Sequence, residues 1–131
     1  MNEQLVRVGT TYLPVSNVEK SLQWYVEKLG AALSYKDEEK AIVNMAGQSF
    51  FLVSAKYGET SNFTDAKGRC RFAFTFEVDG EEALQNIRNQ FIENRVQVGE
   101  IEDRGHKGRN FVFYDLNGNQ FDVWSVLSKD V

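Results

Sequence analysis

Few side chains in this sequence have the chemistry of a catalytic or metal-binding group. It holds one cysteine, Cys70, and one histidine, His106, so neither an internal disulfide nor a cluster of thiolate ligands can form. Arg69 and Arg71 flank Cys70 and would favour its thiolate form, but a lone cysteine beside a strand is more often a small core residue. His106 lies between two glycines, which predicts an exposed turn. Asp122, on an aromatic strand, is therefore the best single candidate for a general base or for a group that holds a cationic ligand.

Other polar side chains are expected on one face of the strands, because alternate side chains of a strand point to opposite faces. In residues 72–78, every second residue is apolar, and this face must meet a helix. The same alternation, applied to four strands, predicts a concave face that mixes aromatic and polar side chains, as small-molecule pockets do. Its predicted members are Thr10, Tyr12, Phe50, Leu52, Arg71, Ala73, Thr75, Glu77, Asp122 and Trp124. Tyr12 and Trp124 are equally well explained as core or dimer contacts, and Arg71 and Glu77 as partners in ion pairs.

Two helices and eight strands are expected to position this face. The first helix is predicted to begin at a capping box formed by Ser16 and Glu19 and to end at Gly30, a left-handed cap. The second is predicted to begin at Asp79, with Glu82 at the third position. The expected strands cover residues 5–13, 33–36, 41–45, 49–54, 72–78, 96–102, 110–114 and 120–127.

The order of elements repeats as βαβββ, with Val15 and Val78 in equivalent places before the two helices. This pattern predicts one α+β domain, residues 1–131, in which two tandem βαβββ modules share a curved, mixed eight-stranded sheet. Module one is expected at about residues 5–55 and module two at about 70–128. The polar segment 56–69 reads as a linker, and the alternative is a loop that folds over a ligand.

Charge and hydropathy exclude two classes of partner. The net charge of −4 and the scattered basic residues argue against nucleic acid, which requires clustered Lys and Arg. No stretch approaches the roughly 20 apolar residues that span a bilayer, and the first residues do not resemble a signal peptide. We therefore expect a soluble protein of the cytoplasm.

Two stretches carry a more specific pattern. Residues 12–30 combine an apolar strand, a capped helix with Trp24-Tyr25 and a closing Leu29-Gly30. Residues 111–123 hold the turn Asp115-Leu116-Asn117-Gly118-Asn119 between two apolar strands. Together they resemble the vicinal oxygen chelate superfamily of glyoxalases, bleomycin-resistance proteins and dioxygenases. Asn17 replaces that family's usual Asp, and Leu116 its usual Pro, and neither change is expected to disturb the fold. The resemblance implies the glyoxalase/bleomycin resistance fold and a homodimer.

The resemblance also implies where a metal would bind. Metal-dependent members hold a divalent ion with four side chains, one from each of four strands. By their distance from the matched motifs, the corresponding positions here are Thr10, Leu52, Ala73 and Asp122. Threonine is a poor ligand for a divalent ion, and leucine and alanine are none. We therefore predict no metal and no other cofactor, and a divalent ion only if these positions are misplaced.

The missing ligands favour a metal-free protein that holds a small molecule, aromatic or cationic, in a concave aromatic groove of a homodimer. The alternative is a metal-dependent lyase, isomerase, thiol transferase or ring-cleaving dioxygenase. A metal-independent enzyme with Asp122 or Glu77 as its base and a purely structural or regulatory module are further alternatives. The sequence identifies neither the ligand nor a reaction.

Overall fold

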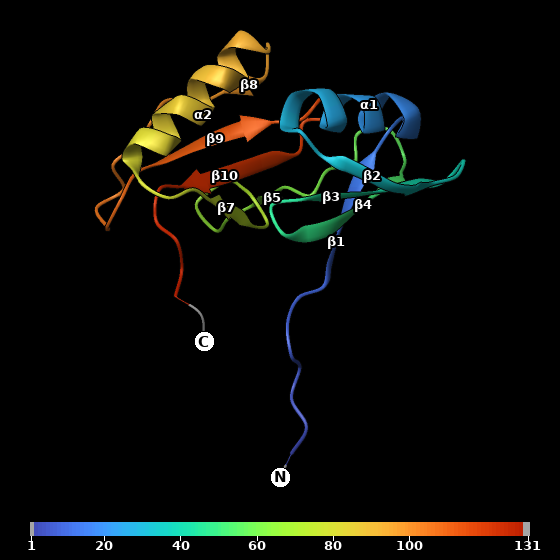
Figure 1. Ribbon diagram of the computed structural model, residues 1–131, viewed down its shortest axis with the longest axis horizontal. Helices are drawn as coiled ribbons and strands as arrows, with labels where there is room; N and C mark the ends of the chain where they lie inside the picture. Colours follow the sequence, from blue (N-terminus) through green and yellow to red (C-terminus); the bar gives the residue numbers. More distant parts are fainter. Residues whose placement is uncertain (1, 130–131) are drawn as a thin grey trace. The chain divides into compact units, whose positions relative to one another are not determined.

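The computed structural model describes residues 2–129 and divides the chain into two compact units, Met1–Tyr57 and Gly58–Val131. Each unit contains the order strand, helix and three strands (Figure 1), preceded in the second unit by a short two-stranded hairpin; this confirms the α+β class and the two βαβββ modules. Among the described residues, hydrogen bonds join the eight expected strands as two four-stranded sheets, one in each unit. No helix in the described part of the chain is long and apolar enough to cross a membrane.

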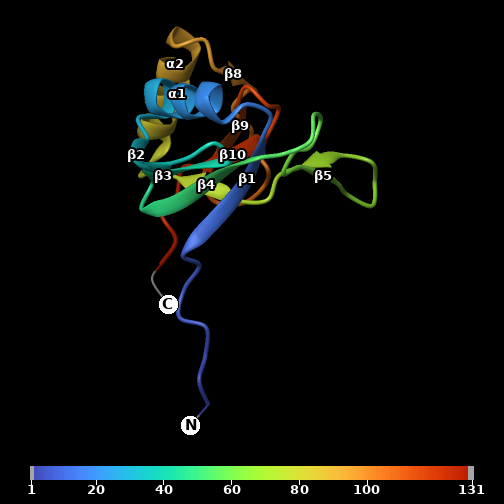
Figure 2. The same ribbon diagram turned by 90° about the vertical axis from the view of Figure 1, so that its right-hand side faces the viewer.

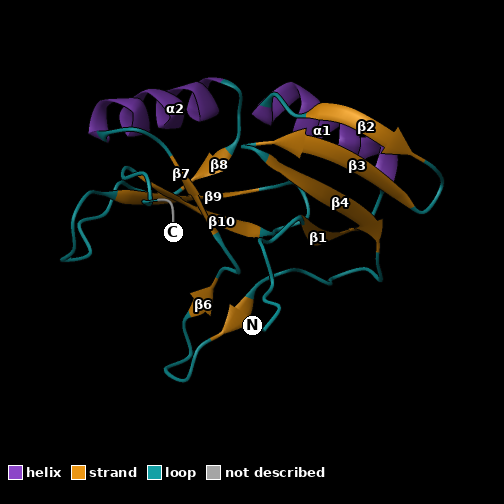
Figure 3. Ribbon diagram, turned by 60° about the horizontal axis from the view of Figure 1, so that its bottom comes forward, coloured by secondary structure: helices purple, strands orange, loops and turns teal. Residues whose placement is uncertain are grey.

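The first unit is a sheet covered on one face by a helix (Figure 3). Its strands run in the order β1-β4-β3-β2, with β1 parallel to β4. The side chains that alternate onto the helix face are apolar and buried, among them Leu13, Val43 and Leu52, and they pack with Leu22 and Tyr25 of the helix. The elements are β1 Thr10–Val15, α1 Val18–Leu29, β2 Ala32–Lys36, β3 Lys40–Met45 and β4 Gln48–Ser54.

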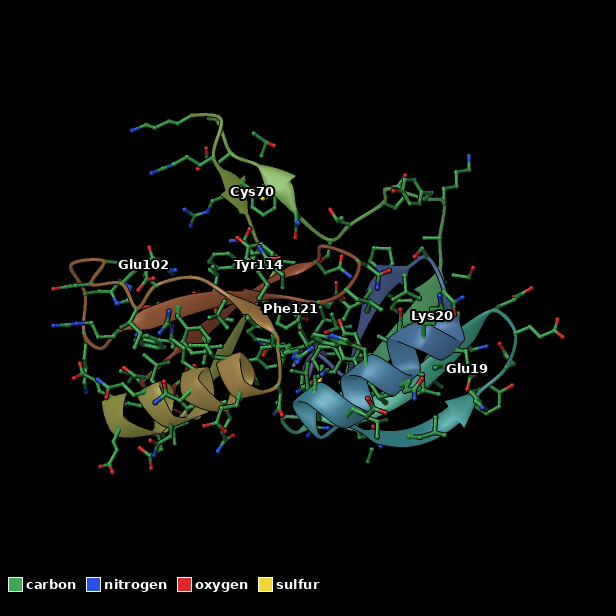
Figure 4. The ribbon with its side chains drawn as sticks, turned by 90° about the horizontal axis from the view of Figure 1, so that it is seen from above. Glu19, Lys20, Cys70, Glu102, Tyr114 and Phe121 are labelled. Atoms are coloured by element: carbon green, nitrogen blue, oxygen red, sulfur yellow. The ribbon has the colours of Figure 1, made fainter. Side chains whose placement is uncertain are left out.

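Helix α1 is capped one residue later than expected. The side chain of Asn17 accepts a hydrogen bond from the backbone N–H of Lys20 at 2.9 Å, so Asn17 rather than Ser16 is the N-cap. Figure 4 shows Glu19 and Lys20 in the first turn of this helix. At its other end, Gly30 has a φ of 70° and confirms the expected left-handed cap.

The second unit has the same topology, with strand order β7-β10-β9-β8. Its helix α2 lies along one face of the sheet (Figure 1), where Phe91 packs on Phe111 and Phe113. The expected cap at Asp79 is wrong, because the N-cap is Gly80, with a φ of 104° that suits glycine. The elements are β5 Phe63–Thr64, β6 Cys70–Arg71, β7 Thr75–Glu77, α2 Glu81–Glu93, β8 Gln97–Val98, β9 Asn110–Tyr114 and β10 Gln120–Trp124.

The segment before β7 differs from the expected continuous strand. Strand β6 ends at Arg71 and β7 begins at Thr75, so the alternation of side chains is interrupted between them. Strands β5 and β6 form a separate hairpin that projects from the second unit (Figure 2).

The turn between β9 and β10 holds the start of the second unit in place. The carboxylate of Asp115 accepts hydrogen bonds from the backbone N–H groups of Asn117 and Asn119. The buried amide oxygen of Asn119 in turn accepts from the backbone N–H of Ser61 at 2.8 Å. Asn62 bonds both the carbonyl of Gly118 and the N–H of Gln120. These residues therefore have a structural role.

The N-terminal part of the first expected strand is not paired. Strand β1 begins at Thr10 instead of residue 5, and the side chains of Leu5, Val6 and Val8 are 101%, 82% and 69% exposed. Residues 2–9 run away from the sheet of their own unit (Figure 2).

Replacing Asn17 with Ala is expected to lower the free energy of unfolding by about 1 kcal/mol, because the N–H of Lys20 loses its acceptor. Urea unfolding followed by circular dichroism measures the change. Asn17→Ser is the matched control and should retain most of the stability, since serine is an equally good N-cap. Equal losses in both variants would contradict the capping role.

Candidate functional site

A pocket of about 520 Å³ lies on the second unit, on the sheet face opposite α2. It is built from strands β6, β7, β9 and β10 and from the loop before β9. Its lining is polar and basic around two aromatic rings. The lining residues are Arg71, Phe72, Thr75, Glu77, Arg104, His106, Lys107, Asn110, Asp122 and Trp124.

Asp122 is the buried acid of this pocket, with a side chain only 2% exposed. Its Oδ2 accepts hydrogen bonds from Thr75 Oγ1 at 3.0 Å and from Asn110 Nδ2 at 2.9 Å. Its Oδ1 lies 3.0 Å from Nη2 of Arg104. Strand pairing places these groups together, since Asp122 is in register with Thr75 on the neighbouring strand β7. The buried charge is thus neutralised by a guanidinium and held by two neutral donors.

Arg104 stays charged at this position. It lies between Asp122 and Glu102, with Nη2 3.0 Å from a carboxylate oxygen of each. Partial burial acts to lower the pKa of Arg104, but the hydrogen bond to Glu102 and the charge of Asp122 raise it above its usual value. Figure 4 labels Glu102, in the segment that leads to this arginine.

Two oxygen atoms of the pocket lack hydrogen-bond donors among the described residues, and both are buried: Asn110 Oδ1 and Asp122 Oδ1. Arg104 Nη2 lies 3.0 Å from Asp122 Oδ1, so the charge of this carboxylate is balanced, while Asn110 Oδ1 has no donor. The bond from Asn110 Nδ2 to Asp122 fixes which end of the amide is the oxygen. A buried acceptor without a donor costs about 1–3 kcal/mol, which a bound group can recover.

The aromatic rings are held by the basic residues around them. The guanidinium carbons of Arg71 and Arg104 lie 5.4 Å and 5.7 Å from the ring centroid of Phe72. Trp124 Nε1 donates to the carbonyl of Lys107 at 2.9 Å, and His106 meets the Trp124 ring edge-on at 5.9 Å. The loop before β9 is thus fixed against the indole.

Gly108 makes this close approach possible. Its φ is 78°, and a Cβ atom there would lie 2.6 Å from Ser125 Oγ and 3.0 Å from Trp124 Nε1. Both the backbone conformation and the lack of space therefore require glycine at this position.

Five of the residues predicted from sequence line the pocket. Four share the expected face of the sheet, Thr75, Glu77, Asp122 and Trp124, and the fifth, Arg71, comes from the separate strand β6. Ala73 does not line it, because it lies exposed in the break between β6 and β7. The same break turns Phe72, expected on the helix face, into a pocket residue. Whether these residues bind a ligand stays a prediction.

In the first unit, one predicted face is wrong. Thr10 and Tyr12, predicted as groove residues, are exposed and are not among the residues that line the pocket of the second unit. The Tyr12 ring contacts Phe51 at 4.9 Å between centroids. Phe50 and Leu52, expected on the same face, are instead 2% and 0% exposed, on the face covered by α1. In the pairing of β1 with β4, Phe50 lies opposite Thr11 and Leu52 lies opposite Leu13. The predicted face of β4 is therefore off by one residue. The residues of β4 that alternate onto the face of Thr10 are Ser49, Phe51 and Val53.

Sequence reasoning missed four further pocket residues: Arg104, His106, Lys107 and Asn110. In the sequence, the basic residues between Arg104 and Arg109 count only among the scattered charges of the chain. A cluster of basic residues directly before a strand of the candidate face could have indicated that this loop contributes to the site. Asn110, at the start of β9, offered none.

The side chains present do not fit the metal site that the resemblance implies. With the register corrected, the position near Leu52 falls on Phe51 or Val53, and neither is a metal ligand. Asp122 remains, with its carboxylate engaged by a cation and two donors. In residues 2–129, no group of three or more His, Cys, Asp or Glu side chains is arranged to hold a metal ion.

Comparisons with known proteins agree on the fold. A family model described as Glyoxalase/Bleomycin resistance protein/Dioxygenase superfamily matches residues 5–123. Lactoylglutathione lyase from Agrobacterium tumefaciens is similar in structure, with 15% identity, a TM-score of 0.72 and coverage of 93% of this chain and 95% of that one. Fosfomycin resistance protein FosX from Listeria monocytogenes, in complex with Mn(II) and sulfate, has 14% identity, a TM-score of 0.74 and coverage of 95% and 93%.

An integron cassette protein from the mobile metagenome of the Halifax Harbour sewage outfall is also similar. It shares 18% identity, with a TM-score of 0.74 and coverage of 93% of this chain and 100% of that one. No curated protein matches the sequence. At these identities, the likenesses show a common fold and leave the activity open.

Replacing Asp122 with Asn is expected to lower the free energy of unfolding by about 2–4 kcal/mol, because Arg104 loses a buried charge partner. Thr75→Val removes a single hydrogen bond to the same carboxylate and should cost only about 1 kcal/mol. Urea unfolding at neutral pH compares the two. A smaller loss for Asp122→Asn than for Thr75→Val would show that the ion pair does not stabilise the unit.

Proposed function

Because the chain belongs to the glyoxalase/bleomycin resistance protein/dioxygenase superfamily, we propose that it is a metal-free protein that binds a small molecule in the pocket of its second unit. The observation that carries the proposal is the pairing of Asp122 with Arg104. The one carboxylate at a family ligand position already has a cationic partner, and a divalent ion beside it would be repelled by the guanidinium.

The pocket has the size and the composition for such a ligand. Its volume of about 520 Å³ falls within the roughly 300–1,000 Å³ typical of small-molecule sites. Phe72 and Trp124 offer ring surfaces for a flat ligand, and both rings are held in position by neighbouring groups. The unused acceptors Asn110 Oδ1 and Asp122 Oδ1 supply polar contacts that fix its orientation.

A metal-dependent enzyme is the second candidate. The structure of FosX contains Mn(II), and lactoylglutathione lyase shares the fold. To hold an ion, this chain would have to break the pair of Asp122 with Arg104 so that Asp122 could bind the metal. The other ligands would have to come from residues outside the positions that correspond to the family's metal ligands. Metal analysis separates the two candidates.

A homodimer in the cytoplasm is part of the proposal. Three apolar side chains, Leu5, Val6 and Val8, are exposed on an unpaired segment that directly precedes β1, and such a segment can pair with a second copy. Cys70 is free and exposed, as suits a reducing compartment.

The metal-free proposal predicts near-zero bound metal, because no set of side chains at the family positions can hold an ion. Elemental analysis of protein purified without a metal-affinity tag measures this before and after incubation with Mn, Ni, Zn and Fe(II). About one tightly bound ion per chain would instead make the metal-dependent enzyme the better candidate.

Ligand binding in the pocket predicts a change in the fluorescence of Trp124. The chain has two tryptophans, so Trp24→Phe leaves Trp124 as the single reporter. We expect small aromatic compounds to quench this emission saturably, while Trp124→Phe, with Trp24 as the remaining fluorophore, serves as the control. If a broad set of such compounds changed neither the emission nor the melting temperature, the pocket would not be a binding site.

The exposed N-terminal residues predict a weaker dimer when they become polar. Val6→Ser combined with Val8→Ser removes apolar surface that only a second copy would cover. We expect the variant to sediment as a monomer at concentrations where the natural chain is a dimer. A natural chain that is monomeric at every concentration, or a variant that dimerises equally well, would remove this part of the proposal.

A further inference from the structure

We infer that the pocket of the second unit selects a small organic acid that carries a hydroxyl group, with the acid at Arg71 and Lys107 and the hydroxyl at Asn110. This inference rests on the proposed function, which states that a small molecule binds there, and adds its chemical class. It follows from the charges that the pocket leaves unbalanced and from the acceptors that it leaves open.

The side chains that line the pocket carry a net positive charge. Three lining side chains are cationic, Arg71, Arg104 and Lys107, against two carboxylates, Glu77 and Asp122. Arg104 pairs with Asp122, and Glu77 accepts hydrogen bonds from the backbone and side chain of Ser128. Among the described residues, neither Arg71 nor Lys107 has an ion pair with a carboxylate. An anionic group of the ligand is the complement of these two cations.

Arg71 is placed to bind an acid group. It is half-buried, and its guanidinium carbon lies 5.4 Å from the centroid of the Phe72 ring. A guanidinium that packs on a ring keeps its N–H groups free at its edge, and that edge matches the two oxygens of a carboxylate. A flat ligand body then has the rings of Phe72 and Trp124 as its nearest apolar surfaces.

The open acceptors define the second group of the ligand. Asn110 is only 3% exposed, its amide orientation is fixed by Asp122, and its Oδ1 has no donor among the described residues. The neighbouring Asp122 Oδ1 is open in the same way. A buried acceptor without a donor, such as Asn110 Oδ1, can be satisfied by a hydroxyl group of the ligand.

An ammonium group would also be a donor, but Arg104 disfavours it. The guanidinium lies 3.0 Å from Asp122 Oδ1, so an ammonium at this oxygen would be next to a like charge in a partly desolvated site. A hydroxyl donates without that repulsion. The cationic ligand that the sequence suggested is therefore the less favourable choice for this pocket.

Calorimetric titration of the natural chain tests the inference with matched compounds. Mandelate and phenyllactate carry a ring, an acid and a hydroxyl group. Phenylacetate and phenylpropanoate lack the hydroxyl, and the methyl esters of the two hydroxy acids lack the charge. We expect each hydroxy acid to bind about 10-fold more tightly than its counterpart without the hydroxyl and than its ester, because each loses a hydrogen bond to a buried or charged group.

Variants locate the two contacts. Arg71→Gln should weaken binding of the acids about 10-fold and leave the esters unchanged. Arg69→Gln is the matched control, because Arg69 pairs with Asp65 and does not line the pocket. Asn110→Leu should abolish the preference for a hydroxyl while keeping the preference for an acid over its ester. The comparison of ligands on the natural chain decides the matter even if Asn110→Leu does not fold.

The outcomes separate this inference from the proposed function. Esters that bind as tightly as acids, or acids that bind equally with and without the hydroxyl, overturn the ligand class while the pocket remains a binding site. The ligand class is also overturned if some compounds quench the Trp124 emission but no acid binds. If no compound of any class quenches Trp124 or shifts the melting temperature, the proposed function fails together with the inference.

Discussion

The second unit is organised around the need to neutralise one buried carboxylate. Asp122 lies in the middle of β10 with almost no exposure, and an ionised group there is tolerated only if charge and hydrogen bonds surround it. The partners come from three separate segments: Thr75 on β7, Asn110 on β9 and Arg104 in the loop that precedes β9. Satisfying one side chain therefore aligns two strands and fixes a loop, and the walls of the pocket result from that alignment.

Proteins that share this fold can differ in the group that supplies positive charge at the same place in the fold. Structures that share the fold at 14–15% identity include one with Mn(II) bound. In this chain, a guanidinium supplies the positive charge next to the acid at a family ligand position. This cation is a side chain of the chain itself and is always present, unlike a metal ion, which has to be bound. The fold fixes where a site lies, while the side chains decide what it binds.

Local patterns predicted the order of elements, the cap at Gly30 and the polar face of β10, because each depends on neighbours in sequence. The face of β4 was wrong because Phe50, Phe51, Leu52 and Val53 are all apolar, and alternation gives no signal in such a run. Phe72 was misplaced because a break in the strand is not visible as a change in composition. Arg104 and Asn110 have roles that arise only when distant segments meet, which no local pattern encodes.

The turn that ends at Gly108 contains both positions that tolerate change and positions that do not. The side chains of His106 and Lys107 are exposed at the rim. Arg104, in contrast, pairs with the buried Asp122, and any side chain at residue 108 would collide with Ser125 and Trp124. Mutations in such a loop can alter charge and shape at the entrance without moving the backbone that carries them. Sequence variation at the pocket entrance is therefore least constrained at residues 106 and 107, whereas residue 108 must stay glycine.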